Sequence, residues 1–476
     1  MVNVRSVATA VVCLIGFCSA ATYSQQTKSS THADQVDIAI TVYNSNLGLV
    51  KDTRHIVVDK GIQELKFKDV AEKINATTVH VKSLTDPKGL TVLEQNYEYD
   101  LLSQQKLLEK YVGQEIHFVE IDRETGAKKV TRAELLSTSG GNIYRVDGKI
   151  LFDVPGSIEL PRIPDNLIAK PTLAWLLSAK KSGKHKVEAS YLTDGINWKA
   201  DYIVVLNEKD TELDLSGWVT IDNRSGATYE NAALKLVAGD VQRVQPERVR
   251  REYFAAARAV KAFEAPQFEE DSFFEYHIYT LGRRTTIKNN QIKQMELLNS
   301  TDISVQKQFV YRGDRSFFTR RINDPGQGNK VGVFIHFENA KKNNLGMPLP
   351  KGIVRVYKKD KDGSLQFAGE NNIDHTAKDE KIRIKVGDAF DVVAERKQTD
   401  FKSIAKRVNE VAFEIEIRNH KDEKVTVVVS EPVYGDWEVV EASHAYEKAS
   451  ARELLFPVEV AADDRAVVKY RVRVKY

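Results

Sequence analysis

Alternation of apolar and polar residues is the main pattern along this chain, and it predicts β-strands. The first clear example starts at Val36, and its apolar members are Val36, Ile38, Ile40 and Val42. A period of two puts such side chains on one face of an extended strand, while the other face meets water. Comparable runs predict further strands at 54–58, 62–67, 77–83, 116–121, 143–146, 149–154, 185–192, 200–206, 213–221, 232–237, 275–281, 303–310, 331–337, 352–358, 364–368, 381–394, 411–418 and 468–476.

The two expected strands nearest the C-terminus carry complementary charges. In 468–476 the apolar residues alternate with Lys and Arg, whereas the polar positions of 411–418 include Glu414 and Glu416. If these strands are neighbours, their opposite charges pair across the sheet, and each pair contributes about 0.2–1 kcal/mol.

Two segments depart from this alternation and predict short helices. In 101–112 the apolar residues recur every three to four positions, which is typical of one amphipathic helix. A shorter apolar helix is expected around Trp175.

Glycine-containing turns predict hairpins. Asp147-Gly148 and Asp362-Gly363 each lie between two expected strands, and such pairs adopt the positive φ angles that tight hairpin turns require. A third turn is expected at 124–126, after the strand 116–121.

These patterns together predict a mainly β fold, with several antiparallel β-sandwich-like modules in series and one or two short helices. Residues 245–274 interrupt the pattern with clustered Arg, an Ala-rich patch and an acidic stretch, and predict a charged loop or linker. The expected division is a signal peptide at 1–21, a flexible leader at 22–34, an N-terminal β module at 35–170 containing the helix 101–112, a central β module in two parts at 171–244 and 275–400 around the loop 245–274, and a C-terminal β-sandwich-like module at 401–476.

The N-terminus has the layout of a cleaved secretory signal. Arg5 precedes an apolar run from Val7 to Phe17, and small residues follow, so cleavage is expected after Ala20 or Ala21. The run is about half the length of a membrane-spanning helix, and no later stretch is apolar enough to span. We therefore expect an exported protein, periplasmic or extracellular, without an integral membrane segment.

Cysteine content and charge narrow the class of protein. Both cysteines, Cys13 and Cys18, lie within the signal, so the mature chain has no disulfide or thiolate chemistry, and a bacterial source is favoured. The formal net charge is +3, of which Arg5 is lost with the signal. Such near-neutrality argues against a nucleic-acid partner, because binding a polyanion requires a strongly basic face.

Several segments together resemble a known bacterial family. They are 191–202 (Tyr-Leu-Thr-Asp-Gly-Ile-Asn-Trp-Lys-Ala-Asp-Tyr), 217–219, 223–226, 236–241, 274–277, 285–287 with Gln291, and 389–392. They are similar to the exported family known as domain of unknown function 4139, related to mucoidy-inhibitor-A-like proteins, over about residues 185–476. The resemblance implies export and a largely β architecture, and it implies no established reaction.

Sequence motifs for catalysis or cofactor binding are missing. The chain has no His-Glu-x-x-His zinc helix, no phosphate-binding glycine loop before Gly-Lys and no Gly-x-Ser-x-Gly nucleophile elbow. Its histidines are scattered singly, so no metal site and no cofactor are predicted.

Three constellations are candidates for binding. The first comprises Tyr191, Asp194, Trp198, Asp201 and Tyr202, whose rings and carboxylates suit a sugar or a peptide, although buried core rings and an Asp-Gly turn are the favoured interpretation. The second contains Asp388 and Asp391, which a strand places on opposite faces. The third is the basic run 180–186, for which a solvated loop is the simpler interpretation.

The sequence thus favours a non-catalytic binding protein whose partner is an envelope component, another protein or itself. The alternative is a hydrolase of envelope polysaccharide or peptide that uses paired carboxylates. Such a hydrolase needs its two carboxyl groups about 5–10 Å apart in one cleft, whereas a binding module needs only a broad exposed face.

Overall fold

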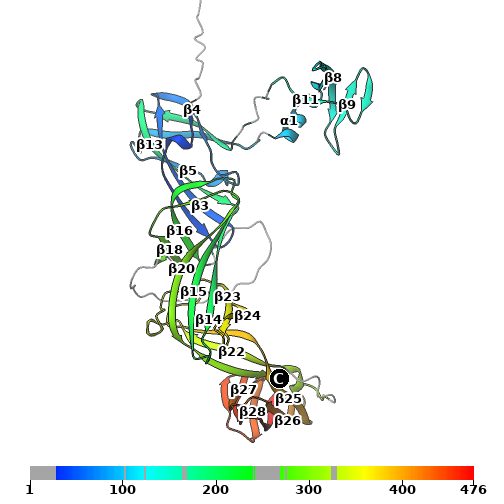
Figure 1. Ribbon diagram of the computed structural model, residues 1–476. Coiled ribbons are helices and arrows are strands. Elements are labelled where there is room, and N and C mark those ends of the chain that lie inside the picture. The colour runs from blue at the N-terminus through cyan, green and yellow to red at the C-terminus, as the bar shows by residue number, and fades with distance from the viewer. Residues whose placement is uncertain are drawn as a thin grey trace, which may run out of the picture. The chain divides into compact units, whose positions relative to one another are not determined.

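The computed structural model describes residues 28–100, 103–122, 125–162, 164, 168, 170–239, 241, 268–273, 276–322 and 330–475. Strands account for 66% of the structure and helical residues for 5%, and the described residues contain one α-helix, α1 (Gln104–Lys110). Several separate sheets are present, so the predicted mainly β fold is confirmed (Figure 1). No helix of the described residues is long and apolar enough to cross a membrane.

The chain forms two compact units. Of the described residues, the first unit comprises 28–36, 53–70 and those within 81–188, and the second comprises 37–52, 71–80 and those from 189 onward.

A four-stranded sheet of the first unit has the order β1 (Lys28–Ser30), β4 (Gly61–Lys68), β12 (Thr172–Ala179), β6 (Leu90–Glu98). The helix predicted around Trp175 is wrong, because Trp175 lies in β12. Strand β12 pairs along its whole length with β4 on one edge and β6 on the other. A central strand that is largely buried on both faces has an unbroken apolar run, and such a run alone does not distinguish strand from helix.

Regular structure is present N-terminal to the position that the alternation indicates. Residues 28–34 were predicted as part of a flexible leader, but Lys28–Ser30 pairs in parallel with β4, and Thr31 caps a short 3-10 turn at His32–Asp34. The fully buried Arg54 donates to the carbonyl of Ser30 at 3.2 Å and fixes this segment. The predicted signal peptide lies outside the described residues.

A second sheet of this unit has the order β10 (Lys149–Leu151), β9 (Ile143–Val146), β8 (Lys128–Ser137), β7 (Glu115–Ile121), β11 (Ser157–Glu159). Leu108 and Tyr111, from α1 and its C-cap, pack with this sheet in one apolar core. The predicted hairpin at Asp147-Gly148 is confirmed, and both residues have positive φ, 48° and 77°. The β7–β8 hairpin is confirmed as well, with Gly126 at φ 68°.

A larger sheet has the order β17 (Phe268–Phe273), β18 (Tyr276–Leu281), β16 (Tyr229–Ala238), β2 (Gln35–Tyr43), β3 (Leu47–Val58), β13 (Gly183–Asp194), β5 (His80–Ser83), and β19 (Thr285–Ile287) also pairs with β16. Strand β17 lies within the predicted charged loop 245–274. The loop residues 245–267 and 274 are outside the described residues.

A five-stranded sheet of the second unit contains Asp201, Trp198 and Tyr202 of the first predicted constellation. Its order is β20 (Gln291–Ser304), β15 (Glu212–Asn223), β14 (Ile196–Leu206), β23 (Gly352–Lys359), β24 (Leu365–Ile373). Strands β14 and β23 pair in parallel although about 150 residues separate them, and the other neighbours are antiparallel. The predicted hairpin at Asp362-Gly363 joins β23 to β24, and Gly363 has φ 85°.

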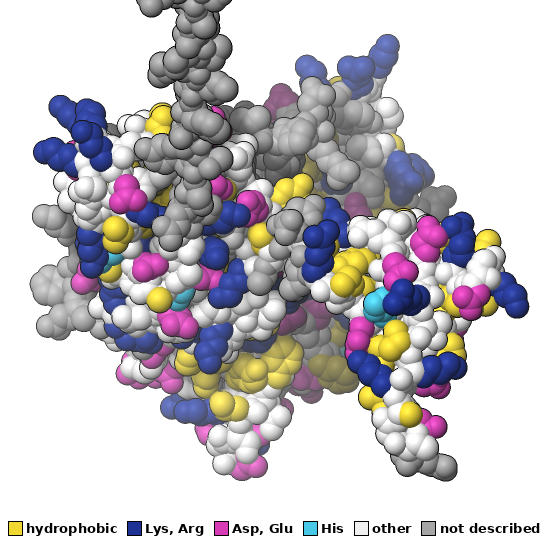
Figure 2. Space-filling view, turned by 90° about the horizontal axis from the view of Figure 1, so that it is seen from above, with side chains coloured by type: hydrophobic (Ala, Val, Ile, Leu, Met, Phe, Trp, Pro, Cys, Tyr) yellow, Lys and Arg dark blue, Asp and Glu magenta, His cyan; other side chains and the backbone are white. Residues whose placement is uncertain are grey.

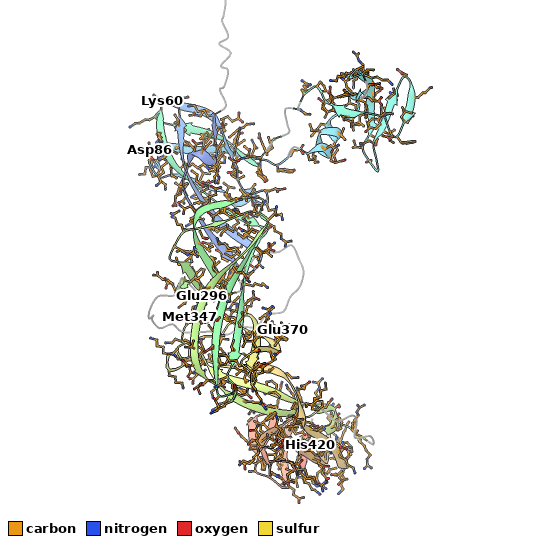
Figure 3. The ribbon with its side chains drawn as sticks, in the orientation of Figure 1. Lys60, Asp86, Glu296, Met347, Glu370 and His420 are labelled. Carbon is orange, nitrogen blue, oxygen red and sulfur yellow. The ribbon has the colours of Figure 1, made fainter. Side chains whose placement is uncertain are left out.

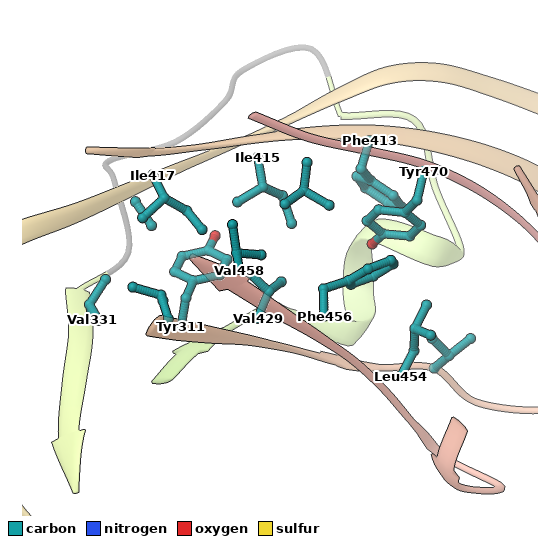
Figure 4. Packing of buried hydrophobic residues seen from close by; sticks show 14 of the residues in the cluster. Tyr311, Val331, Phe413, Ile415, Ile417, Val429, Leu454, Phe456, Val458 and Tyr470 are labelled. Atoms are coloured by element: carbon teal, nitrogen blue, oxygen red, sulfur yellow. The ribbon is translucent and has the colours of Figure 1, made fainter. Parts of the chain in front are cut away.

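The C-terminal part folds around one apolar core. Nine strands follow the order β28 (Asp436–Ala442), β31 (Asp464–Lys475), β26 (Val408–Asn419), β25 (Lys381–Ala405), β22 (Lys330–Glu338), β21 (Gln306–Arg312), β27 (Val425–Pro432), β30 (Glu453–Val460), β29 (Glu447–Ser450). Figure 4 shows Phe413 and Tyr470 packed with Phe456 in this core.

The predicted charge pairing of the last strands is confirmed. Strands β26 and β31 are antiparallel neighbours, and Glu414 faces Lys469 with their charged atoms 3.1 Å apart. Arg473 contacts Glu410 on β26 at 3.0 Å and Glu438 on β28 at 2.7 Å. The apolar positions of both strands are buried, as their alternation predicts.

Candidate functional site

The aromatic residues of the first predicted constellation belong to the core. Tyr191, Trp198 and Tyr202 are almost completely buried. The Trp198 indole donates to the carbonyl of Val237 at 3.0 Å, and the Tyr202 hydroxyl donates to the carbonyl of Pro350 at 2.7 Å. Burial also raises the pKa of Tyr202 well above its ordinary value. These rings therefore position strands and do not present a surface for a ligand.

The two aspartates of that constellation are far apart. Asp194 is exposed at the end of β13, and Gly195 then leads the chain into β14, where Asp201 lies in the middle of the strand. The five residue steps from Ile196 to Asp201 span about 16 Å of extended chain. This separation exceeds the distance at which two carboxyl groups cooperate in glycoside hydrolysis.

The two aspartates of the second predicted pair make separate contacts. Asp388 is exposed on β25, and its carboxylate lies 2.8 Å from the ammonium group of Lys385. The backbone carbonyl of Asp391 accepts a hydrogen bond from the backbone N–H of His420 at 2.7 Å. In the basic run 180–186, Lys184 to Lys186 belong to β13, and His185 is buried.

One serine–histidine contact joins the sequence neighbours Ser443 and His444 at 2.9 Å on the exposed surface. A second contact of this kind, which is buried, contains His185. Its Nδ1 lies 3.2 Å from the Ser83 hydroxyl, which also accepts from the backbone N–H of Asp86. Both side chains of the pair are buried, so a substrate has no access to this hydroxyl. Among the described residues, moreover, no three His, Cys, Asp or Glu side chains are placed to hold a metal ion.

Asp201 belongs instead to a polar row that crosses the five-stranded sheet. The Gln294 amide donates to the Thr220 hydroxyl at 3.1 Å, and that hydroxyl donates to Asp201 Oδ2 at 2.9 Å. Arg355 donates to Asp201 Oδ1 at 3.1 Å, and its Nε lies 3.5 Å from the carboxylate of Glu370. The row takes one residue from each strand, in the order β20, β15, β14, β23, β24. Its last member, Glu370, is labelled in Figure 3.

Alternation explains why these residues share a face. The intervening residues of the central strands, such as Ala200, Val219 and Val354, are buried and form the opposite, inner face. We call the face that carries the polar row the outer face.

Apolar side chains lie beside the polar row on the outer face. Trp218 is a direct cross-strand neighbour of Asp201, and it retains 36% of its surface in solvent. Ile203 and Tyr357 occupy the following positions on β14 and β23, and the rings of Tyr357 and Phe367 meet edge to face with centroids 5.6 Å apart. Phe367 and Leu365 of β24 are more than half exposed.

The outer face has no strong charge of one sign. Close to Trp218 and the Tyr357–Phe367 pair, Asp201, Glu296 and Glu370 contribute three carboxylates, while Lys199, Arg355 and Lys359 contribute three cations. The surface seen from above in Figure 2, which does not identify the outer face, also has basic and acidic side chains interspersed. The outer face can therefore offer aromatic contacts and hydrogen bonds without attracting a highly charged polymer.

Sequence reasoning found Asp201 but missed its neighbours Trp218, Arg355, Phe367 and Glu370. Trp218 sits at a polar position of an alternating strand, which is a usable signal of an exposed aromatic residue. Arg355 and Glu370 give no comparable signal, because their contacts depend on the pairing of β14 with the distant β23 and β24.

Comparison with known proteins supports the family resemblance. No curated protein matches this sequence. The family described as "Domain of unknown function (DUF4139)" matches residues 187–476, which is more than half of the chain and includes the entire outer face. The chain therefore belongs to the DUF4139 family.

Proposed function

We propose that this protein is exported and binds a component of the cell envelope on the outer face, without catalysing a reaction. The observation that carries the proposal is the exposure of Trp218, Phe367 and Leu365 on a regular sheet whose other face is a buried core. Exposed aromatic residues that adjoin hydrogen-bonding groups are typical of recognition surfaces, since a ring offers apolar area at a low entropic cost.

The placement of the carboxylates supports binding over hydrolysis. Asp194 and Asp201 are too far apart to act on one bond, and both oxygens of Asp201 already contact Thr220 or Arg355. A general acid or base needs a carboxyl group that can exchange a proton with the substrate. The alternative of a carboxylate-dependent hydrolase therefore has little support.

Export rests on the N-terminal sequence pattern and on the position of the cysteines within it. The test is fractionation of the source cells followed by N-terminal analysis of the protein. We expect a mature chain that starts at residue 21 or 22 outside the cytoplasm. A cytoplasmic protein that still contains Cys13 and Cys18 would contradict export.

Binding is tested by adding the tagged mature protein to envelope preparations and measuring the retained fraction. We expect the double variant Trp218→Ala/Phe367→Ala to lose at least about tenfold in affinity, because both side chains are aromatic anchors. The matched control is Phe390→Ala, which removes an aromatic ring that is 95% exposed on β25, outside the outer face. Its retention should equal that of the wild type.

Two outcomes would overturn the proposal. Equal retention of the double variant and the wild type would exclude the outer face as the binding surface. Release of shortened products from the retained material, abolished by Asp201→Asn, would establish a hydrolase instead.

A further inference from the structure

We infer that the ligand of the outer face is an uncharged linear polysaccharide that lies obliquely across the strands, from Trp218 to the Tyr357–Phe367 pair. This inference rests on the proposed function and specifies the chemical class of the ligand.

The register of the strands places the apolar residues on one diagonal. Trp218 of β15 faces Asp201 of β14, and Ile203 is the next outward residue of β14. Ile203 lies in register with Arg355 of β23, and Tyr357 is the next outward residue of that strand. Each step thus moves one strand sideways and two residues along. The result is an apolar track, which we define as Trp218, Ile203, Tyr357 and Leu365.

The track is long enough for several consecutive sugar rings. From Trp218 to Tyr357 it crosses two strand spacings and four residues, which corresponds to about 16 Å between Cα atoms. Leu365 of the adjoining β24 pairs with Lys359 of β23 and extends the track by one further strand. Phe367 flanks Tyr357 on the same strand and widens this end of the track.

Hydrogen-bonding groups accompany the apolar track along one side. Arg355 lies next to Ile203, and Glu370 continues the row onto β24, while the buried Asp201 holds Arg355 in place. A pyranose ring has an apolar C–H face that can stack on an aromatic ring, and hydroxyl groups at its rim that both donate and accept hydrogen bonds. The pairing of a track with a polar row matches these two properties of one molecule.

The charges distinguish this ligand from an anionic polymer and from a protein. Asp201 and Arg355 are ion-paired with each other, and the three cations near the track are balanced by three carboxylates, so a polyanion would find no net positive surface. The centres of protein interfaces are depleted of Asp and Glu, whereas here Asp201 directly adjoins Trp218. An uncharged polyhydroxylated chain satisfies both conditions.

Trp218 supplies a selective optical probe. The chain has four tryptophans, and the other three, Trp175, Trp198 and Trp437, are at most 5% exposed. Acrylamide quenches the fluorescence of exposed indoles, so the quenchable part of the emission reports on Trp218 in the full mature protein. A ligand that covers Trp218 should reduce this quenching, and Trp218→Phe should remove the quenchable part.

The probe is a delipidated envelope extract, used untreated, after proteinase digestion, and after digestion followed by acid cleavage of glycosidic bonds. We expect protection of Trp218 to survive the proteinase, to disappear after acid cleavage and to remain in the fraction that passes an anion exchanger. Phe367→Ala should need about tenfold more extract for half-protection, and Phe390→Ala should need no more than the wild type.

The outcomes separate this inference from the proposed function. If protection of Trp218 is lost after proteinase digestion, the ligand is not a polysaccharide. If only material held by the anion exchanger protects Trp218, the ligand is not uncharged. Either result contradicts this inference but leaves a ligand on the outer face. If the untreated extract gives no protection while the wild-type protein is retained by envelopes, the outer face is not the binding surface and both proposals fail.

Discussion

Removing the carboxylate of Glu431 tests the energetics of the C-terminal core most directly. Arg396 of β25 donates to Glu431 of β27 at 2.9 Å, and both side chains are almost inaccessible, with 3% and 0% of their surfaces exposed. Arg396 also stacks on Phe413, with its guanidinium carbon 3.9 Å from the ring centroid. Burial raises the pKa of Glu431, although attraction to Arg396 opposes this shift.

Glu431→Leu leaves the Arg396 guanidinium buried without a counter-charge. Loss of one partner from a buried ion pair costs about 3–5 kcal/mol, because the remaining charge is desolvated and uncompensated. The double variant Arg396→Met/Glu431→Leu removes both charges and keeps apolar volume in the core. Its stability should lie within about 1–2 kcal/mol of the wild type.

Amide hydrogen exchange of peptides from β26 and β31 is the appropriate assay, because it measures the local opening free energy in a protein with several sheets. At about 1.4 kcal/mol for each factor of ten, Glu431→Leu should accelerate exchange in these strands about one hundred- to several thousandfold. The matched control is Glu414→Leu, which breaks the surface pair with Lys469 and should cost at most about 1 kcal/mol.

An acceleration of exchange below about tenfold in Glu431→Leu would refute the reasoning, since a buried uncompensated charge should destabilise the strands by more than that factor corresponds to. A double variant that exchanges as fast as the single variant would refute it as well. That result would mean that lost packing, rather than the unpaired charge, causes the instability.

Two further predictions concern a cluster of charges and a turn. Asp210 lies 2.7 Å from Lys307 Nζ and 2.5 Å from Lys358 Nζ; burial raises its pKa, but hydrogen bonds from the two lysines outweigh burial and hold the pKa below the ordinary 3.8. A group whose pKa is lowered in the folded state stabilises the fold above pH 3.8, and this stabilisation is lost as the pH falls further. Asp210→Asn should therefore lower the Tm near neutrality, and the difference in Tm from the wild type should shrink toward about pH 2. An equal difference in Tm at pH 7 and at about pH 2 would show that the ion pairs of Asp210 do not stabilise the fold. Gly195 has φ +81°, and a Cβ there would lie 2.6 Å from the carbonyl oxygen of Arg224, whereas Gly363, at φ +85°, has open space around it. In chemical denaturation Gly195→Ala should therefore cost more than about 2 kcal/mol and Gly363→Ala about 1 kcal/mol, and equal losses would show that strain in φ alone accounts for both.

The local sequence pattern was sufficient to predict a strand and its buried side chains where one face of the strand is exposed to solvent and the other is buried. In 411–418 and 468–476 every second residue is apolar, so the buried set follows from the period of two and the register of charges follows from complementarity. The Asp-Gly turns were equally predictable, because few residue pairs accept their positive φ angles. The same logic misassigned Trp175, because a strand buried on both faces has no polar face to reveal its period.

The sequence by itself thus determined the class of fold and the inward residues of most strands. Only the tertiary structure decided which strands became neighbours, above all the parallel pairing of 200–206 with 352–358, which brings Arg355 to Asp201 and completes the outer face. The physical reason is that side-chain alternation is a local property, whereas partner choice depends on the packing of segments far apart along the chain.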